Sequence, residues 1–320
     1  QRFEDQNLLQ GKGRFIDDIS RPNMLYAAFL RSPHGHAKIH NITTAPALDS
    51  PGVVRVLTAE DLPEHLRTTP MPLLVPNAAM PNAQPQYCLA RDEVCYAGEP
   101  IAVVLANSRY QAEDALALID VDYEPLGAAS DLATAAQSNA ATAHVGRESN
   151  IAASYTVAYG EIDAAFATAP YIFRESIWQH RGGGMAMEPR GTIAEYDADT
   201  DALTVWATTQ APHMTQRMMA DVMGRSPESI RIITPDVGGG FGPKVIFYPE
   251  DGVIPAAAMI TGRPIKHIED RREHFMCATQ ERDQLWEMEI ALDNDGKVLG
   301  VRGTMLHDSG AYVPWGIIMP

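Results

Sequence analysis

Cysteine is scarce in this 320-residue sequence, and long apolar runs are missing from it. The three cysteines, Cys88, Cys95 and Cys277, are an odd and sparse set that supports neither a disulfide scaffold nor a CxxC motif. No stretch approaches 18 consecutive apolar residues, and the first residues lack the basic and apolar segments of a signal peptide. The sequence therefore predicts no membrane span and favours a reducing, cytoplasmic compartment.

Positive charge is also in short supply. The 25 Lys and Arg residues face 41 Asp and Glu residues, which leaves a net charge of -16 at pH 7. Such a surface repels a phosphate backbone and disfavours a role in nucleic-acid binding. Hydrophobic residues make up 45% and charged residues 21%, as in globular proteins. The length suffices for about two domains.

The first region alternates between strand and helix patterns. Residues 100–106 form an apolar run typical of a buried strand, and residues 119–123 alternate like a second strand. Between them, Ser108 stands three residues before Gln111, which is a capping-box spacing, and apolar residues then recur with the period of an amphipathic helix. Two further strands are expected, at residues 24–30 and 53–57.

The pattern restarts after a stretch of small and polar residues. Residues 127–150 contain almost no bulky hydrophobic side chain, so we predict a linker there. Beyond it we expect a strand at 203–208, a helix at 212–224 closed by Gly224, a strand at 230–233 and a hairpin at 286–301. The fold class is therefore α+β. Its parts are an α/β domain over 1–126, the linker over 127–150 and a mixed α/β domain over 151–320.

A glycine run is the most informative feature of the second domain. Four glycines occupy five positions between Gly238 and Gly242, and each costs roughly 0.5–1 kcal/mol of chain entropy on folding. A close approach of the backbone to a ligand explains that cost. The run fits neither familiar phosphate loop, because Pro243 stands where a dinucleotide fingerprint needs glycine and Val245 where a Walker A loop needs Ser or Thr. A glycine-rich turn without a ligand is the alternative.

Two further segments carry side chains capable of chemistry. Gln210 follows the strand at 203–208 and offers a donor and an acceptor to a ligand; the alternative is an ordinary surface residue beside a capping Thr209. Glu188 is a candidate acid or base; the alternative is a structural carboxylate, for example one paired with Arg190. The charged run at 269–273 is expected to be solvated and self-paired.

Three histidines suggest a weaker hypothesis. His34, His36 and His40 share one parity on a strand and so could face one side as zinc ligands. The flanking Pro33 and Gly35 favour a turn instead, and no acidic residue between Pro33 and Ile42 completes the ligand set.

Several segments, taken in order, carry a family resemblance. They are Leu9–Asp18, Arg31–Ala37, Tyr96–Pro100, Val121–Pro125, Thr209–Gln210, Gly238–Lys244 and Asp308–Tyr312. Together they resemble the molybdenum-binding large subunit of the xanthine oxidase and aldehyde oxidoreductase family of molybdenum hydroxylases. The resemblance implies an α/β hammerhead domain followed by the first part of a molybdopterin-binding domain.

The resemblance also implies a chemistry and a set of cofactor contacts. Family members oxidise aldehydes or N-heteroaromatic substrates with water as the oxygen source, and they pass electrons through [2Fe-2S] clusters to FAD, which we expect in partner subunits. The cofactor is molybdopterin, with or without a cytosine dinucleotide. Its expected contacts in this chain are Gln210, Gly239, Gly240, Phe241 and Gly242, and no side chain is expected to ligate the metal directly.

Val245 and Glu188 are the expected substrate-pocket residues. Val245 stands where purine-oxidising members carry a glutamate that hydrogen-bonds the substrate. Valine makes no such bond, so xanthine is disfavoured.

The family's large subunits are much longer than this chain, and their catalytic glutamate lies in the part that this sequence lacks. We therefore expect no catalytic base here and no activity without a second molybdopterin-domain polypeptide or a continuation of the chain. Three alternatives stay open: a subunit like that of aerobic carbon monoxide dehydrogenases, a zinc hydrolase built on the three histidines, and a non-catalytic assembly subunit.

Overall fold

The computed structural model describes residues 3–77, 80 and 82–315. The chain divides into two compact units, which are described separately below. The first unit contains Gln1–Leu74, Pro85–Leu126 and Gly184–Thr279, and the second contains Val75–Gln84, Gly127–Gly183 and Gln280–Pro320. The α+β class expected from the sequence is confirmed.

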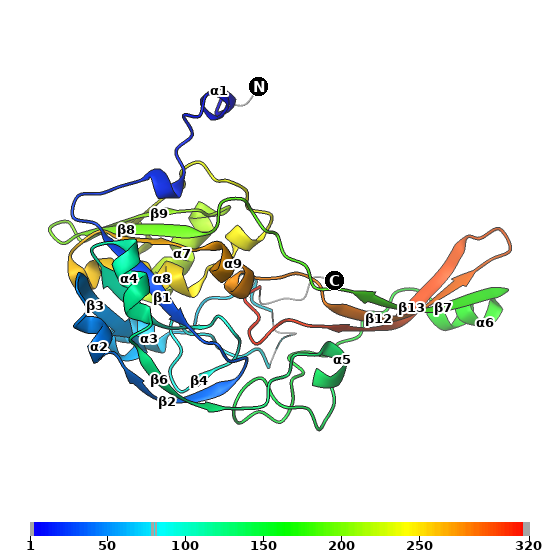
Figure 1. The fold of residues 1–320 in the computed structure, drawn as a ribbon. Helices are drawn as coiled ribbons and strands as arrows, with labels where there is room; N and C mark the ends of the chain where they lie inside the picture. Colours follow the sequence, from blue (N-terminus) through cyan, green and yellow to red (C-terminus); the bar gives the residue numbers. More distant parts are fainter. Residues whose placement is uncertain (1–2, 78–79, 81, 316–320) are drawn as a thin grey trace. The chain divides into compact units, whose positions relative to one another are not determined.

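A seven-stranded mixed sheet forms the framework of the first unit (Figure 1). Its strands, in spatial order, are β10 (Ile230–Ile233), β9 (Ala202–Ala207), β8 (Gly191–Asp197), β11 (Ile265–Ile268), β1 (Leu25–Arg31), β5 (Pro100–Ala106) and β3 (Val53–Thr58). At the centre, β1 pairs in parallel with β11, with Leu25 opposite Ile265, and antiparallel with β5. One sheet therefore joins the N-terminal region to strands that lie more than 150 residues later in the sequence.

Helices cover both faces of this sheet. On one face, α7 (Pro212–Met223) and α8 (Pro249–Thr261) bury a large apolar cluster with the odd-numbered residues of β1, such as Leu25 and Phe29. On the other face, α2 (Ala45–Leu48) and α4 (Arg109–Leu116) pack on Ala28 of β1 and on alternate residues of β5. Strand β5 is buried along its whole length, as its continuous apolar sequence predicts.

The expected elements of the first region are confirmed. Ser108 accepts a hydrogen bond from the Gln111 amide and caps α4, and the predicted strands form β1, β3, β5 and β6 (Asp120–Pro125). In the later region, β9, α7 and β10 are also confirmed, and Gly224 closes α7 with a φ of 63°. The remaining helical segments of this unit are α1 (Asp5–Leu9), α3 (Glu64–Thr68), α9 (Arg271–Cys277) and the 3-10 turns at Ile16–Asp18, Ala59–Asp61, Pro227–Ser229 and Pro243–Val245.

A small antiparallel sheet completes the first unit. Its order is β4 (Glu93–Val94), β2 (Ala37–Thr43) and β6. The pairing of β2 with β6 shifts its register between Ile39 and Asn41, so His40 is a bulge residue. Such a bulge interrupts the alternation of side chains between the two faces.

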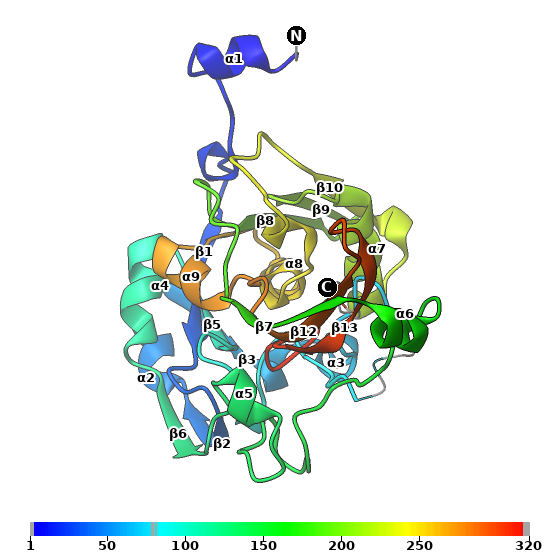
Figure 2. The ribbon, with the colours of Figure 1, turned by 90° about the vertical axis from the view of Figure 1, so that its right-hand side faces the viewer.

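The second unit is built on a three-stranded antiparallel sheet of β13 (Val298–His307), β12 (Gln284–Leu292) and β7 (Tyr171–Gln179), which lie side by side in Figure 2. The predicted hairpin is the β12–β13 pair. Helices α5 (Leu132–Ala135) and α6 (Ile162–Thr168) contact this sheet. Every residue of β7 is exposed, including Phe173 and Trp178.

Among the residues that the structure describes, no helix combines the length and the apolar character needed to span a bilayer.

The cap of α4 provides a first test of the fold. Replacing Ser108 with Ala leaves the Gln111 amide without its acceptor and should lower the free energy of unfolding by about 1 kcal/mol. Denaturant unfolding measures the loss. Ser138→Ala, at an exposed loop position, is the control and should be neutral. Equal stability of the two variants would contradict the assigned cap.

Candidate functional site

The glycine-rich loop follows β10 and ends in the 3-10 turn at Pro243–Val245. Gly239 and Gly242 have φ angles of 100° and 99°, which favour glycine strongly. Between them, Phe241 also has a positive φ of 54°, and its side chain is 75% exposed. A bulky residue in this conformation stores backbone strain, and such strain is typical of ligand-binding loops.

Two other glycines in the loop leave room for side chains of the same unit. A Cβ atom on Gly240 would lie 2.4 Å from Cδ of Gln210, and a Cβ atom on Gly238 would lie 2.5 Å from Cβ of Glu188. Both positions therefore require glycine, because the side chains of Gln210 and Glu188 pack directly against the backbone there. The structure thus brings the loop together with Gln210 and Glu188.

Gln210 lies between β9 and α7 and is fixed at both ends. Its backbone N–H donates to the carbonyl of Lys244 at 2.9 Å, and its Oε1 accepts from the Gly242 N–H at 3.0 Å. Its Nε2 donates to no acceptor in the described part of the chain, so this donor is available to a ligand. Thr209 accepts from the Ala211 N–H, but Ala211 rather than Thr209 occupies the N-cap of α7.

Three consecutive backbone amides are also available. The N–H groups of Gly239, Gly240 and Phe241 have no acceptor within residues 3–77, 80 and 82–315. Successive amides in a strained glycine-rich turn form a concave set of donors that suits an anion or a polarised oxygen. With Gln210 Nε2, the loop offers four hydrogen-bond donors.

Glu188 fixes the base of this loop together with Lys244. The Nζ of Lys244 lies 2.9 Å from Oε2 of Glu188, and the same oxygen accepts from the Gly238 N–H at 2.8 Å. The Lys244 side chain is fully buried and that of Glu188 is 13% exposed. Burial lowers the pKa of Lys244, and its ion pair with Glu188 acts in the opposite direction. The partner of Glu188 is therefore Lys244, and the alternative pairing with Arg190 is wrong.

Arg190 belongs to a separate buried ionic network beside the site. Its guanidinium lies 3.2 Å from Glu250 and 2.5 Å from Glu269, and it stacks over the ring of Tyr248 at 3.6 Å. Arg31 forms a second pair with Glu250 at 2.7 Å. Each buried charge has a partner, which is the condition for burying it without a large penalty.

The carboxylates of this network have strongly shifted pKa values. Burial alone would raise the pKa of Glu269, but Arg190 and a hydrogen bond from His274 outweigh burial and lower it to about 2. In the same way, Arg190 and Arg31 overcome burial and hold the pKa of Glu250 well below its usual range. Both groups are therefore ionised at neutral pH.

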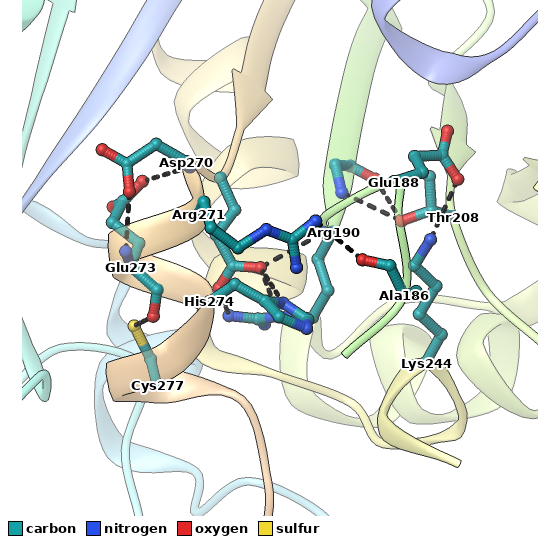
Figure 3. A network of polar contacts seen from close by, with 12 residues as sticks. Ala186, Glu188, Arg190, Thr208, Lys244, Asp270, Arg271, Glu273, His274 and Cys277 are labelled. Carbon is teal, nitrogen blue, oxygen red and sulfur yellow. Dashed lines mark hydrogen bonds and ion pairs between the residues drawn. The ribbon is translucent and has the colours of Figure 1, made fainter. Parts of the chain in front are cut away.

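The expectation of a solvated, self-paired run at 269–273 is wrong for Glu269 and Arg271, which bind partners outside the run. Glu269 is 1% exposed because it neutralises Arg190, while Asp270 and Glu273 form the capping box of α9 (Figure 3). Arg271 donates to the carbonyls of Ala186 and Met187, at 2.7 and 2.8 Å. The run therefore anchors the segment that carries Glu188.

Val245 is half-buried in the 3-10 turn, and its N–H donates to the Gly242 carbonyl. The turn places it one residue after Lys244, at the end of the donor loop. Sequence reasoning missed the partners Lys244, Glu250 and Glu269, because nothing in their local patterns distinguishes a buried ion pair from a solvated charge.

The proposed histidine site at His34, His36 and His40 is wrong. His34 packs edge-on against Tyr123, and His40 pairs with Glu124 at 3.0 Å. The bulge at His40 breaks the alternation on which the hypothesis depended. Of the three histidines, only His36 belongs to a group of side chains close enough to hold a metal ion in the described part of the chain.

Family models match almost the whole chain. The model of the molybdopterin cofactor-binding domain covers residues 143–320, and that of the aldehyde oxidase and xanthine dehydrogenase a/b hammerhead domain covers residues 10–127. The chain belongs to the molybdenum hydroxylase family. The recognition made from the motifs is thereby confirmed, as is the order of hammerhead and molybdopterin-binding domains.

Individual relatives agree with this assignment. The chain is 33% identical to the nicotine 6-hydroxylase large subunit of Paenarthrobacter nicotinovorans, and the match covers 97% of this chain and 38% of that subunit. It is 36% identical to the carbon monoxide dehydrogenase large chain of Afipia carboxidovorans, over 97% and 39% of the two chains. The crystal structure of quinoline 2-oxidoreductase from Pseudomonas putida 86 superimposes with a TM-score of 0.90 at 35% identity, over 97% and 39%. The chain thus spans less than half the length of these relatives.

The Glu188–Lys244 pair predicts a large stability effect. Glu188→Ala leaves the ammonium of Lys244 buried without a counter-charge and should lower the free energy of unfolding by about 3 kcal/mol. The control is Glu113→Ala, which removes the exposed partner of Arg109 on α4 and should cost no more than about 0.5 kcal/mol. Equal losses in denaturant unfolding would contradict a buried pair.

The pKa of Glu269 predicts a pH dependence. Because folding lowers this pKa from 4.5 to about 2, the resulting stabilisation is fully present above pH 4.5 and is lost as the pH falls through 2. The difference in unfolding free energy between the wild type and Glu269→Gln should therefore shrink between pH 5 and pH 2. Denaturant midpoints across this range measure it. A difference that stays constant would show that Glu269 has the same pKa in both states.

Proposed function

We propose that this chain supplies the hammerhead domain and the first part of the cofactor pocket of a molybdenum hydroxylase. The proposal rests on four hydrogen-bond donors without an acceptor in the described part of the chain, in a protein of this family. They are the amides of Gly239, Gly240 and Phe241 and Nε2 of Gln210. The proposed domain bounds are 1–126 for the hammerhead, 127–150 for the linker and 151–320 for the molybdopterin-binding part.

The residues present fit a molybdenum–pterin group, with or without a cytosine dinucleotide. Such a group carries oxo and sulfur ligands that accept hydrogen bonds. Glycine at position 240 keeps the donors beside Gln210 accessible, because a Cβ atom there would collide with the Gln210 side chain. When bound, the cofactor supplies two-electron oxidation of a carbon centre with water as the oxygen source. The loop itself is fixed in advance by the Gly242–Gln210 and Gly238–Glu188 hydrogen bonds, so little reorganisation is needed on binding.

Each residue of the loop then has a defined task. The amides of Gly239, Gly240 and Phe241 would hold acceptor atoms of the cofactor, and Nε2 of Gln210 would donate a further hydrogen bond to it. Gly242 positions Gln210 by donating to its Oε1. Glu188 and Lys244 keep the loop base in place, and this structural task fits the contacts of Glu188 better than a role in the substrate pocket.

The proposed substrate is an aldehyde or an N-heteroaromatic ring. Val245 at the end of the loop offers an apolar surface and no hydrogen bond, which disfavours a polar purine. The relatives named for nicotine and quinoline act on N-heteroaromatic compounds. Carbon monoxide is a second candidate, because the carbon monoxide dehydrogenase large chain is 36% identical to this chain.

The relatives are more than twice as long as this chain, and we propose that their remaining part, as a continuation or a second chain, contributes the catalytic base. The exposed apolar side chains of β7 are a surface that such a segment would cover. Subunits with [2Fe-2S] clusters and FAD complete the proposed electron path. The three cysteines form no disulfide, and this suits the proposed cytoplasmic location.

The donor loop is tested by Gly240→Ala in the assembled complex. The added methyl group would displace Gln210 and cover the open amides, so the molybdenum content should fall about tenfold, equivalent to about 1.4 kcal/mol of binding free energy. Metal analysis gives the content, and circular dichroism verifies folding. Ser138→Ala, at an exposed loop position, is the control. Unchanged molybdenum in a folded Gly240→Ala complex would overturn the proposal.

The role of Gln210 distinguishes a catalytic from an assembly subunit. Gln210→Ala removes one donor at the reacting centre and should lower kcat about a hundredfold while the complex still assembles. The exposed Gln137→Ala should have no effect. Unchanged turnover of the Gln210→Ala complex would favour the non-catalytic assembly subunit.

A further inference from the structure

A cluster of three side chains in the small sheet has a donor set that suits a metal ion. One nitrogen of His36, one carboxylate oxygen of Glu93 and the sulfur of Cys95 lie within 4.8 Å of one another. Of these atoms, Nε2 of His36 lies 3.2 Å from Oε2 of Glu93. We propose that His36, Glu93 and Cys95 form a binding site for a divalent transition-metal ion such as Zn²⁺.

The backbone around the cluster is held by its sheet. Ala37 pairs with Val94, and Lys38 with Glu93, so His36 and Cys95 leave the ends of two hydrogen-bonded strands together. The carbonyl of His36 accepts from the Leu126 N–H at 3.0 Å. The Cys95 N–H donates to the buried carboxylate of Glu99 at 2.6 Å. The three ligands are therefore arranged before an ion arrives, which lowers the entropic cost of binding.

The chemistry of the three donors selects the kind of ion. An imidazole nitrogen, a thiolate sulfur and a carboxylate oxygen together suit Zn²⁺ and its neighbours, whereas Mg²⁺ and Ca²⁺ require oxygen ligands. A thiolate and a carboxylate also carry two negative charges, which balance the charge of a divalent ion. The site with its bound ion would therefore carry no net charge. The Cys95 thiol would release its proton when the ion binds.

Burial leaves one side of the site accessible. His36 is 4% exposed and Cys95 is 5% exposed, while the Glu93 side chain is 25% exposed. Three protein ligands with one open side match a tetrahedral site whose fourth ligand is water. The proposed site departs from the expectation that no side chain of this chain ligates a metal. It shares no residue with the glycine-rich loop.

The consequence for the fold lies in β4, which has only two residues and pairs with β2 alone. An ion bound by His36 at one end of β2 and by Glu93 and Cys95 of the β4 segment would cross-link these two segments. The proposed ion therefore has a structural effect that is separate from oxidation at the cofactor, and its binding is measurable without any activity.

The site is tested by titrating the full chain, freed of adventitious metal, with Co²⁺ as the probe. Thiolate ligation of Co²⁺ produces a charge-transfer absorption in the near ultraviolet, and tetrahedral coordination intensifies the visible bands. We expect both signals to saturate at about one Co²⁺ per chain, and Zn²⁺ to displace the probe. Cys95→Ser should abolish the near-ultraviolet band, and His36→Gln should weaken Co²⁺ binding at least about tenfold.

Two matched variants control for the other thiol and histidine sites. Cys277→Ser removes a partly buried thiol outside the cluster, and His40→Gln removes a histidine of β2, so both variants should bind Co²⁺ like the wild type. Circular dichroism establishes that each variant is folded. A folded wild type without the near-ultraviolet band, or a band that persists in Cys95→Ser, would overturn the proposal. The molybdenum content has no part in the readout, so this test and that of the proposed function fail independently.

Discussion

The buried guanidinium of Arg190 is the interaction on which the arrangement of the site depends. Arg190 is two residues after Glu188 in the sequence. Its side chain forms ion pairs with Glu250 at the start of α8 and with Glu269 just after β11. These three residues come from parts of the chain that are far apart in sequence, so the ion pairs fix the segment 186–190 relative to the sheet. Removing any one of them would break at least one buried ion pair and unbalance the charge of the network, so the position of the segment depends on all three residues together.

That fixed segment explains the glycine-rich loop. Glu188 binds the Gly238 amide and Lys244 from one side, while Gln210 binds Gly242 and lies against Gly240 from the other. The loop is thus held at both ends by side chains, and the amides between these ends are left without acceptors. This arrangement requires the four glycines despite their entropic cost on folding, because two of them allow close packing and two adopt a positive φ. Preorganised donors of this kind are useful to a cofactor because they do not have to be ordered when it binds.

Local patterns predicted what depends on local physics. The capping spacing and apolar period of α4, the continuous apolar run of β5 and the left-handed closure of α7 at Gly224 each follow from a few neighbouring residues, and the structure confirms them. The family and the donor loop were recognisable from motifs. The parallel pairing of β1 with β11, the burial of Glu269 and the Lys244–Glu188 pair are long-range contacts, and a sequence pattern contains no information on the partner of a charge. His40 shows the same limit, because a bulge moved it away from the face that its parity predicted.

In the second unit, apolar side chains are exposed, whereas in the first unit charged side chains are buried. Strand β7 has partners on only one edge, and Tyr171, Phe173, Ile177 and Trp178 are all about half exposed. Exposed edges with large apolar side chains promote association with other strands, and the charges of Arg174 and Glu175 in the middle of β7 counteract it only in part. Covering these side chains would remove apolar surface from water and stabilise the sheet by about 25 cal/mol for each Å² covered. The side chains that leave this sheet incompletely covered are therefore the ones that would stabilise it most if another segment packed against them.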